Sequence, residues 1–477
     1  MGVTGRSGGG TQTAYIAALD DRVLAAAPEC YITSFDKLLQ SAGPQDAEQN
    51  LMHFLAKGLD LADLIEVRAP KPTLIVSTTR DMFSIQGVRD TYQEAQKAFQ
   101  ALGKTEQLAK VEDDAAHAST PKNREATYAF FQKYLNNPGS SEDQTVTIFS
   151  EEDLFVTPGG DVQKDRKGES LFSMNKKYAA DMVQKRAQQS TDPKNIRAKA
   201  ISYSGYKHPT ASPSVLFSGK TQMETYTIEK YLLKGPGDYH LPVLWLKPVN
   251  TSGKAILLLD DRGKALALKQ GELAHQLVSA GHEVIVPDLS GTGELGHGYM
   301  QGGDSVIEGI PLNLWYAGIL THKSLVAVRA EEISMLASFI KKSFTAPRPL
   351  AVVAAGTFTS DLLHAATFDN PFDGIVLLRP LASYQSITEE RLYKAKFAMS
   401  AVAGAMQAYD LPDLVAGFRQ SKLLLVNPVD ATDQELGQEV SGSIFKSTLS
   451  KQSGQRSFLR TSVKPEEYGP TIGDWLK

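Results

Sequence analysis

A serine in a glycine-rich turn near the start of the sequence is the first residue whose setting indicates chemistry. Residues 5–9 read Gly-Arg-Ser-Gly-Gly and match G-x-S-x-G, a motif that puts a serine on a strained turn between a strand and a helix. The glycines are expected to leave room for this tight turn, and the apolar residues 14–19 suit the helix that should follow. The N-terminal end of that helix and the backbone N–H of Gly8 would then face a developing oxyanion. Ser7 is thus the candidate nucleophile, and the alternative is a serine that serves only the turn.

Asp81 and His117 follow Ser7 in the order that a serine nucleophile requires. A serine hydroxyl needs a base to take its proton, and the base needs an acid to hold its tautomer. Residues 1–136 contain only two histidines, and His53 precedes the candidate acid within a helical stretch, so His117 is the expected base. The alternatives are a helix N-cap for Asp81 and an exposed loop residue for His117.

The segments around these residues alternate between strand-like and helical patterns. Over residues 1–136 this alternation predicts a parallel sheet with helices between its strands. Short strands are predicted at residues 23–27, 73–77 and 107–111, and helical stretches at residues 36–64, 85–102 and 124–135. Asp81 and His117 therefore lie in loops that follow predicted strands.

A second α/β pattern begins at about residue 224. Its first two strands, at residues 226–233 and 239–246, flank a Gly-Pro-Gly turn and indicate a β-hairpin. Buried strands are then predicted at residues 255–259, 283–287, 350–354, 374–378 and 423–426. The connecting residues contain an expected strand at 147–156 and an expected amphipathic helix at 171–189.

The two patterns resemble diverged copies of each other. Residues 21–31 parallel residues 373–384, and the segments before and after them correspond as well. By this alignment the second half contains everything that the first has, together with a hairpin and two strands that should precede it. The first half is therefore expected to begin in mid-fold, at or just after its fifth strand.

The second half lacks the residues for the same chemistry. Its serine position aligns near Thr357 and Phe358, and Asp430 or Asp433 could fill the position of the acid. No histidine follows His364 in the sequence, so no base can follow that acid. This half is expected to be structural or to bind substrate.

Composition excludes several other classes of protein. Lysine and arginine number 50 against 54 acidic residues, a net charge of −4, which argues against a general nucleic-acid binder. The single cysteine, Cys30, excludes an intrachain disulfide and any thiolate-rich zinc or iron–sulfur site. No uncharged apolar run approaches the ~20 residues of a membrane-spanning helix. No basic and apolar leader precedes the turn motif, so no signal peptide is predicted.

Two further patterns indicate no cofactor. Residues 291–296 spell the dinucleotide-binding fingerprint, but no apolar helix follows them, which favours a loop. The histidines of the second half have no metal-ligand spacing such as H-E-x-x-H, so no metal site is predicted there.

Several segments resemble a known family. Residues 2–11 (Gly-Val-Thr-Gly-Arg-Ser-Gly-Gly-Gly-Thr), residues 18–23 (Ala-Leu-Asp-Asp-Arg-Val) and the stretch from His117 to Leu135 look like the acetyl xylan esterase-like α/β-hydrolases of bacterial polysaccharide degradation. The tandem layout, with a second hydrolase-like half that has lost its catalytic residues, fits the same group. The resemblance implies an α/β fold with two α/β-hydrolase-like domains. The first domain would be residues 1–136, the C-terminal part of a catalytic domain that is truncated at the nucleophile turn. The second would be residues 223–477, a complete but degenerate, non-catalytic domain. Residues 137–222 would connect them.

By this resemblance Ser7 would be the nucleophile, His117 the general base, Asp81 its orienting acid and Gly8 one oxyanion donor. The implied reaction is ester hydrolysis through an acyl-enzyme, releasing acetate from a carbohydrate ester of plant polysaccharide, with no metal or organic cofactor. Family members are usually exported, which implies a secreted or periplasmic protein. They also have strands before the serine turn, and a loop there supplies the second oxyanion donor. The chain is therefore expected to be a truncated form of a longer secreted enzyme.

Two functions of different classes follow from these observations. The first is a serine carboxylesterase with its catalysis in residues 1–136. The second is a non-catalytic remnant whose second half is a carbohydrate-binding or scaffold module. A peptidase of related fold is a third option.

Overall fold

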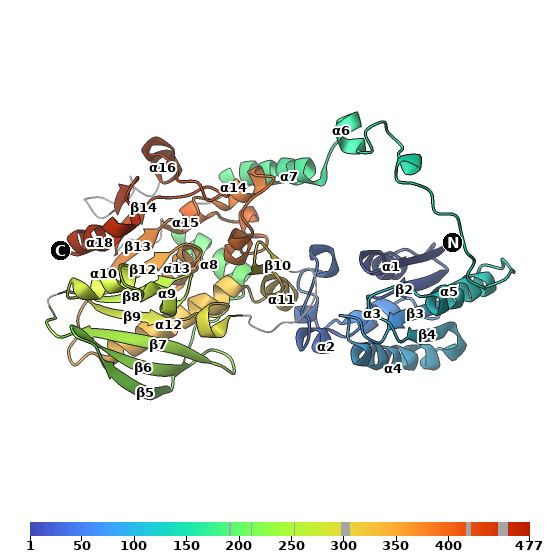
Figure 1. Ribbon diagram of the computed structural model, residues 1–477, viewed down its shortest axis with the longest axis horizontal. Helices are drawn as coiled ribbons and strands as arrows, with labels where there is room; N and C mark the ends of the chain where they lie inside the picture. Colours follow the sequence, from blue (N-terminus) through green and yellow to red (C-terminus); the bar gives the residue numbers. More distant parts are fainter. Residues whose placement is uncertain (190–191, 211, 252, 297–305, 416–420, 447–456) are drawn as a thin grey trace. The chain divides into compact units, whose positions relative to one another are not determined.

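The computed structural model describes residues 1–189, 192–210, 212–251, 253–296, 306–415, 421–446 and 457–477. These residues form two compact units, which are described separately (Figure 1). The first unit comprises residues 1–168 and 306–322, and the second comprises the other described residues.

The first unit is built on a four-stranded sheet in the order β1-β2-β3-β4. Its strands are β1 (Gly2–Arg6), β2 (Ala25–Glu29), β3 (Thr73–Thr78) and β4 (Leu108–Asp113). Every neighbouring pair is parallel, and Arg6, Glu29, Val76 and Val111 are aligned across the sheet. Because the strands run in one direction, the loops that follow them lie at one edge. These loops carry the residues singled out in the sequence.

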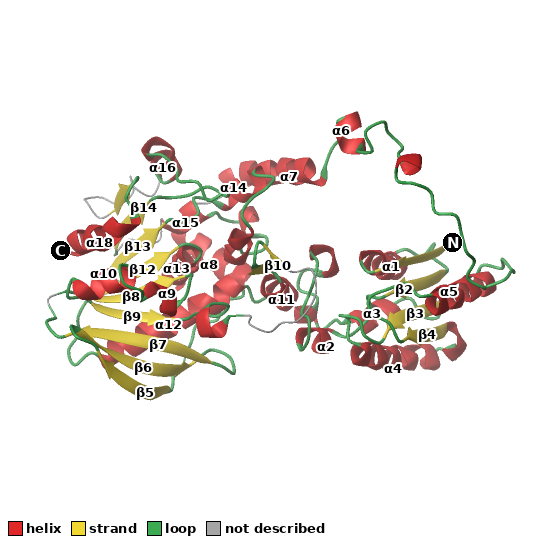
Figure 2. Cartoon of the chain, in the orientation of Figure 1, coloured by secondary structure: helices red, strands yellow, loops and turns green. Residues whose placement is uncertain are grey.

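Helices cover both faces of this sheet (Figure 2). Ile75 of β3 lies in an apolar cluster with Ala14, Leu61 and Phe99, which belong to helices on one face. Phe130, from the helix on the other face, packs with β2 and β3. The helices of this unit are α1 (Gly8–Leu19), α2 (Phe35–Leu39), α3 (Leu61–Glu66), α4 (Ile85–Ala101), α5 (Pro121–Tyr134), α6 (Val162–Arg166) and α11 (Asn313–Thr321).

Short elements complete the first unit. Four are 3₁₀ turns: η1 (Ala47–Gln49), η2 (Leu55–Lys57), η3 (Thr105–Gln107) and η4 (Glu152–Leu154). The strands β10 (Val306–Ile307) and β11 (Ile310–Pro311) form a small antiparallel ribbon. Helix α11 joins the unit through Leu320, which lies in the main apolar cluster, and through Ile319 O, which accepts a 2.8 Å hydrogen bond from His53 N.

The second unit contains, among the described residues, a nine-stranded sheet in the order β15-β14-β13-β12-β8-β9-β7-β6-β5. The hairpin strands β5, β6 and β7 are antiparallel to their neighbours, and the strands from β9 and β8 to β15 are parallel. The strands are β5 (Val215–Gln222), β6 (Tyr226–Lys234), β7 (His240–Pro248), β8 (Ala255–Asp260), β9 (Glu283–Pro287), β12 (Leu350–Ala355), β13 (Gly374–Leu378), β14 (Lys422–Val426) and β15 (Ser457–Arg460).

Large apolar clusters lie on the two faces of this sheet and are covered by helices. The helices are α7 (Leu171–Ala187), α8 (Pro193–Ser204), α9 (Lys264–Ala267), α10 (Leu273–Ser279), α12 (Leu325–Ser343), α13 (Phe358–Phe368), α14 (Tyr384–Glu389), α15 (Leu411–Val415), α16 (Gln438–Ile444) and α18 (Tyr468–Leu476). The 3₁₀ turns are η5 (Gly293–Leu295), η6 (Ala395–Ser400), η7 (Ala405–Gln407) and η8 (Pro465–Glu467).

The α/β fold predicted from the sequence is confirmed, and the two units share a four-strand arrangement. Strands β12, β13, β14 and β15 have the same order and direction as β1, β2, β3 and β4. Ala355, Leu378, Val426 and Arg460 are aligned in the second unit as Arg6, Glu29, Val76 and Val111 are in the first. In the second unit β12 also pairs with β8, whereas β1 has no second strand partner among the described residues.

The structure differs from the sequence prediction in the connecting region. The strand expected at residues 147–156 is absent, because its apolar side chains, including Ile148 (89% exposed), meet no partner strand in the described chain. Residues within 137–222 instead supply α7, α8 and the whole of β5 to the second unit, and residues 306–322 belong to the first. No described helix is both long and apolar enough to cross a lipid bilayer.

Candidate active site

Ser7 lies on a sharp turn between the end of β1 and the start of α1. Its backbone has φ 58° and ψ −121°, a positive-φ conformation that L-residues other than glycine rarely adopt. The turn is held from both sides, because Ser7 N donates to Glu29 O (3.0 Å) and Ser7 O accepts from Thr11 N (2.9 Å). Such strain persists only where the surrounding structure enforces it, and it is common at active sites.

The glycines around this turn are not equivalent. A Cβ on Gly5 would lie 2.6 Å from Gly9 O, and a Cβ on Gly10 would lie 2.3 Å from Glu29 O, both rigid backbone atoms. Around Gly9, the last glycine of the motif, no atom lies within 4 Å of a Cβ. The expectation that the motif's glycines leave room for the turn therefore holds for Gly5, where a side chain would collide with the backbone, but not for Gly9, where a side chain would fit. The second position without room for a side chain is Gly10, which lies outside the motif.

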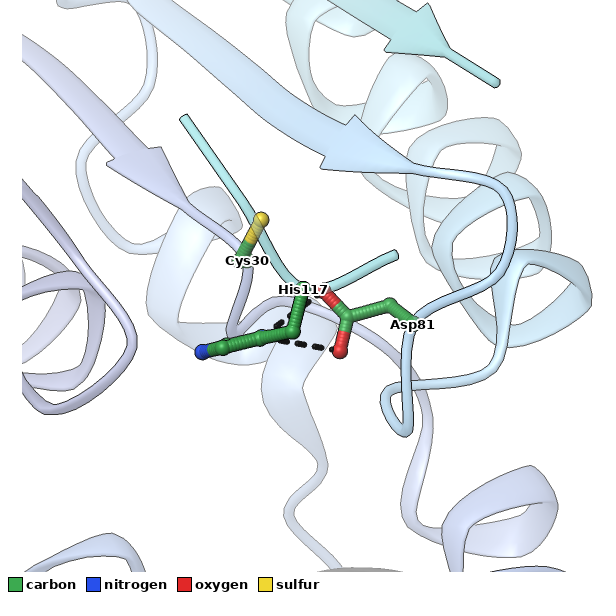
Figure 3. Close-up of side chains that lie close together, drawn as sticks. All are labelled: Cys30, Asp81 and His117. Atoms are coloured by element: carbon green, nitrogen blue, oxygen red, sulfur yellow. Dashed lines mark hydrogen bonds and ion pairs between the residues drawn. The ribbon is translucent and has the colours of Figure 1, made fainter. Parts of the chain in front are cut away.

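Asp81 and His117 are brought together by the loops after β3 and β4. His117 Nδ1 lies 3.0 Å from both Asp81 carboxylate oxygens, and the other ring nitrogen points away from Asp81 (Figure 3). The Asp81 side chain is 2% exposed and that of His117 25% exposed. An Nδ1–H that donates to the carboxylate leaves the Nε2 lone pair free to accept a proton.

Further hydrogen bonds fix the Asp81 carboxylate. Thr78 Oγ1 donates to Oδ2 (3.1 Å), and Phe83 N donates to Oδ1 (3.2 Å). Asp81 is not the N-cap of α4, which is Ser84. The carboxylate is therefore held in contact with His117, and the N-cap alternative for Asp81 does not describe its position.

Ser7 lies at the same sheet edge as this pair, since each of the three residues follows the C-terminal end of a parallel strand. In the described chain no hydrogen bond joins the Ser7 hydroxyl to His117. Catalytic hydrogen bonds are often long in a free enzyme and shorten when substrate binds. The geometry thus brings Asp81 and His117 into contact and places Ser7 on a strained turn at the same edge.

Gly8 is the first residue of α1, and its N–H has no hydrogen-bond acceptor among the described residues. The partial positive charge at the start of this 12-residue helix adds to that of the N–H. The exposed Glu48 lies close by, because Glu48 Oε1 is 3.2 Å from the position of a Cβ on Gly8. Gly8, directly after Ser7, therefore has an N–H without an acceptor among the described residues and a carboxylate close by.

Cys30 is a neighbour of this site that sequence reasoning did not select. It directly follows β2, has φ 51° and is 2% exposed. Burial, and next the charge of Asp81, raise the pKa of the Cys30 thiol to about 12. The thiol is therefore protonated at neutral pH and is a poor nucleophile. Cys30, like Asp81 and His117, follows a predicted strand, and this position in the sequence could have indicated that it lies near them.

In the second unit, Gly356 occupies the backbone position of Ser7. It follows β12, has φ 62°, and donates its N–H to Leu378 O (3.0 Å) as Ser7 donates to Glu29 O. The sequence alignment, which placed the serine position near Thr357 and Phe358, was therefore wrong at this point. A glycine offers no side chain for nucleophilic attack.

A carboxylate of the chain itself occupies the adjoining anion site of the second unit. Asp261 Oδ2 accepts from Thr357 N (2.8 Å) and from Thr357 Oγ1 (3.0 Å). Thr357 N corresponds to Gly8 N, since each is the first N–H after the positive-φ residue. A Cβ on Gly356 would lie 2.2 Å from Asp261 Oδ2. Burial is the main cause that raises the pKa of Asp261.

The other residues expected at this edge have structural partners. Asp430 accepts from Thr432 and Gln434 within its own turn, and Asp433 pairs with Arg379 and Lys396. His364 lies in the core, bonded to Ser360 O and to the Tyr409 hydroxyl. Burial lowers the pKa of His364 to about 4. These residues form no serine–histidine–acid arrangement.

No protein-family model and no curated protein sequence matches the chain. Solved structures with a similar chain path include a Bacteroides fragilis NCTC 9343 protein whose assignment as an acetyl xylan esterase is provisional. The match has 15% sequence identity, covers 68% of this chain and 88% of that chain, and has a TM-score of 0.49. The acetyl xylan esterase of Paenibacillus sp. R4 matches at 13% identity over 60% of this chain and 95% of its own, with a TM-score of 0.40.

Acetyl xylan esterase 1 of Thermoanaerobacterium sp. JW/SL YS485 matches at 14% identity over 60% of this chain and 92% of its own, with a TM-score of 0.36. At these identities and TM-scores no residue role is transferred from these proteins. The strand–serine–helix turn and the chain order of serine, aspartate and histidine are those of α/β-hydrolases. The chain has an α/β fold with a parallel sheet in the first unit and a mixed sheet in the second, and the solved structures that match it include acetyl xylan esterases.

Proposed function

We propose that the first unit is a serine carboxylesterase that hydrolyses acetyl or similar small acyl esters on plant polysaccharides. The observation that carries the proposal is the buried Asp81 carboxylate, held 3.0 Å from His117 Nδ1 at the sheet edge where Ser7 occupies its strained turn. An oriented base at the same sheet edge as a serine turn suits acyl transfer through a covalent intermediate.

In this reaction the Ser7 hydroxyl oxygen attacks the ester carbonyl while His117 Nε2 takes the hydroxyl proton. The imidazolium ion that forms is stabilised by Asp81. His117 then gives the proton to the leaving alcohol, so that the sugar hydroxyl departs and an acyl-Ser7 remains. A water molecule, deprotonated by the same histidine, releases the carboxylic acid and restores Ser7.

Gly8 N–H and the start of α1 stabilise the oxyanion of each tetrahedral intermediate in this scheme. One donor of this kind is typically worth about 10²–10³-fold in rate. In the second unit the equivalent Thr357 N–H is already bonded to Asp261. This difference, with Gly356 at the serine position, supports the assignment of catalysis to the first unit alone.

The test is hydrolysis of an activated acetyl ester by the full chain and by Ser7→Ala. The variant is expected to lose activity by several orders of magnitude, up to ~10⁶-fold as for the nucleophile of a serine protease. A fluorophosphonate probe should label the wild type and not the variant. Ser84→Ala, a change at a nearby serine that caps no backbone N–H, serves as the control and should keep full activity. Activity or labelling that survives Ser7→Ala would rule the assignment out.

A second candidate function is ligand binding by the second unit. A cavity of about 410 Å³ lies there, lined by charged and polar side chains that include Arg186, Gln385, Asp413 and Asp430. Such a lining suits a polyhydroxylated ligand such as an oligosaccharide. Saturable binding of a xylo-oligosaccharide by a chain that fluorophosphonate does not label would favour this function over the esterase.

Glu48 is expected to disfavour esters that carry a negative charge. Its carboxylate lies beside Gly8, where the oxyanion forms. Glu48 is exposed, and two charges about 6 Å apart in a water-like dielectric repel by roughly 0.7 kcal/mol, which corresponds to about threefold in rate. Glu48→Gln should therefore raise kcat/KM for a hemisuccinate ester about threefold relative to the acetate ester, and added salt should reduce the difference.

Glu106→Gln is the matched control for this prediction, because Glu106 precedes β4 and so lies at the opposite edge of the sheet. It should leave the ratio of the two kcat/KM values unchanged. An equal ratio in Glu48→Gln and the wild type would show that Glu48 does not select substrates by charge.

A further inference from the structure

Three side chains at the C-terminal edge of the first sheet form a cluster that can hold a metal ion. Cys30 Sγ, a carboxylate oxygen of Asp81 and a ring nitrogen of His117 all lie within 4.8 Å of one another (Figure 3). They come from the loops after β2, β3 and β4, so their proximity depends on the sheet and not on spacing in the sequence. Cys30 has no role in the proposed reaction.

The donor set fits a thiophilic divalent cation. Zn²⁺ binds thiolate sulfur at about 2.3 Å and imidazole nitrogen or carboxylate oxygen at about 2.0–2.2 Å. A tetrahedral ion holds such atoms about 3.3–3.6 Å apart, so the widest pair here has to close by about 1 Å. Thiolate and carboxylate together balance the charge of the ion at a place where both side chains are buried. Mg²⁺ and Ca²⁺ prefer oxygen ligands and suit the cluster poorly.

We propose that Cys30, Asp81 and His117 form an inhibitory site for Zn²⁺ and similar thiophilic cations. The ion binds the Nδ1 lone pair of His117, and the thiol proton of Cys30 passes to solvent. The imidazole then carries its proton on Nε2 and cannot take one from Ser7. The bound ion thus prevents His117 from acting as the base, and it also binds the Asp81 carboxylate that would orient the ring. The effect on activity rests on the proposed function, whereas binding of the ion does not.

Co²⁺ as a probe tests binding directly on the full chain. Because Cys30 is the only cysteine, a thiolate-to-cobalt charge-transfer band in the near ultraviolet can come from this residue alone. We expect the band to saturate at one equivalent, to disappear on addition of Zn²⁺, and to be absent in Cys30→Ala. Cys30→Ser keeps the volume of the buried side chain and replaces the alanine variant if that variant does not fold.

Zn²⁺ should inhibit Ser7-dependent hydrolysis of the acetyl ester, EDTA should restore it, and Mg²⁺ or Ca²⁺ at the same concentration should have no effect. Cys30→Ala is expected to keep wild-type activity without metal. It should need about 100-fold more Zn²⁺ for half inhibition, because even indirect partners of a metal ligand change affinity 10–100-fold.

Two results would overturn the proposal: no Cys30-dependent cobalt band, or equal Zn²⁺ inhibition of the wild type and Cys30→Ala. A band without inhibition would overturn the inhibitory role. A Cys30-dependent band in a chain that shows no Ser7-dependent hydrolysis would support the metal site and contradict the proposed esterase function instead.

Discussion

Replacing Asp81 by asparagine is expected to lower kcat for an activated acetyl ester by about 10⁴-fold, the effect of the corresponding change in a serine protease. An asparagine amide can donate its N–H to His117 Nδ1, which moves the ring proton to Nε2 and leaves no acceptor for the Ser7 proton. The side chain keeps its shape, and its oxygen can still accept from Thr78 Oγ1 or Phe83 N. KM should therefore change little, and the loss should fall on kcat. The rate of fluorophosphonate labelling of Ser7 should fall in parallel.

Asp114→Asn is the control for this change. Asp114 lies in the exposed turn after β4, where it accepts from Thr79 Oγ1 and pairs with Arg80. Its side chain is 79% exposed, so the variant should keep its activity within about twofold. Asp81→Asn with more than about a tenth of wild-type kcat would mean that His117 does not depend on Asp81 for its tautomer.

Alanine at Gly10 is expected to destabilise the first unit by about 3 kcal/mol, the upper part of the usual range for overpacking. The new Cβ would lie 2.3 Å from Glu29 O, which belongs to the buried β2 and cannot rotate away. The same carbonyl accepts the N–H of Ser7, so the displacement also disturbs the turn that holds the candidate nucleophile. Activity should fall together with stability.

Gly9→Ala is the matched control, one residue away in the same helical turn. A Cβ there meets no atom within 4 Å, and alanine in a helix is roughly 0.5–1 kcal/mol more favourable than glycine. Hydrogen exchange of peptides that cover β1 and α1 measures the effect within the first unit, since a chain of two units need not unfold in one step. Equal protection in Gly9→Ala and Gly10→Ala would show that the contact with Glu29 O is readily relieved.

The sequence was sufficient to predict strands whose burial is visible as a continuous apolar run. Residues 283–287 and 374–378 were predicted with the bounds that β9 and β13 have in the structure. A segment buried on both faces of a parallel sheet needs no alternation of polar and apolar residues. The strand β5 was missed because its residues are mostly exposed and it is defined by pairing with β6. The expected strand at 147–156 has apolar residues but no partner, and pairing is a non-local property.

The same distinction applies to the candidate site. Ser7 was predicted because the turn motif is local, and Asp81 and His117 because each follows a recognisable strand. The closeness of Cys30 to Asp81 and His117 depends on the order of strands in the sheet. The contact between Asp261 and Thr357 also joins loops that follow neighbouring strands, β8 and β12. Backbone conformation identified Gly356 as the equivalent of Ser7, which a letter-by-letter alignment cannot do.

The Asp261 contact also affects which substitutions the second unit can accept at position 356. A serine Cβ at position 356 would lie 2.2 Å from Asp261 Oδ2, so a serine there requires the carboxylate to move away or be replaced. Loss of the carboxylate alone would strip Thr357 N and Thr357 Oγ1 of their acceptor. Each single substitution is therefore unfavourable on its own. The effects of the two substitutions should not be additive, because removal of the Asp261 carboxylate relieves the contact that a serine at position 356 would make.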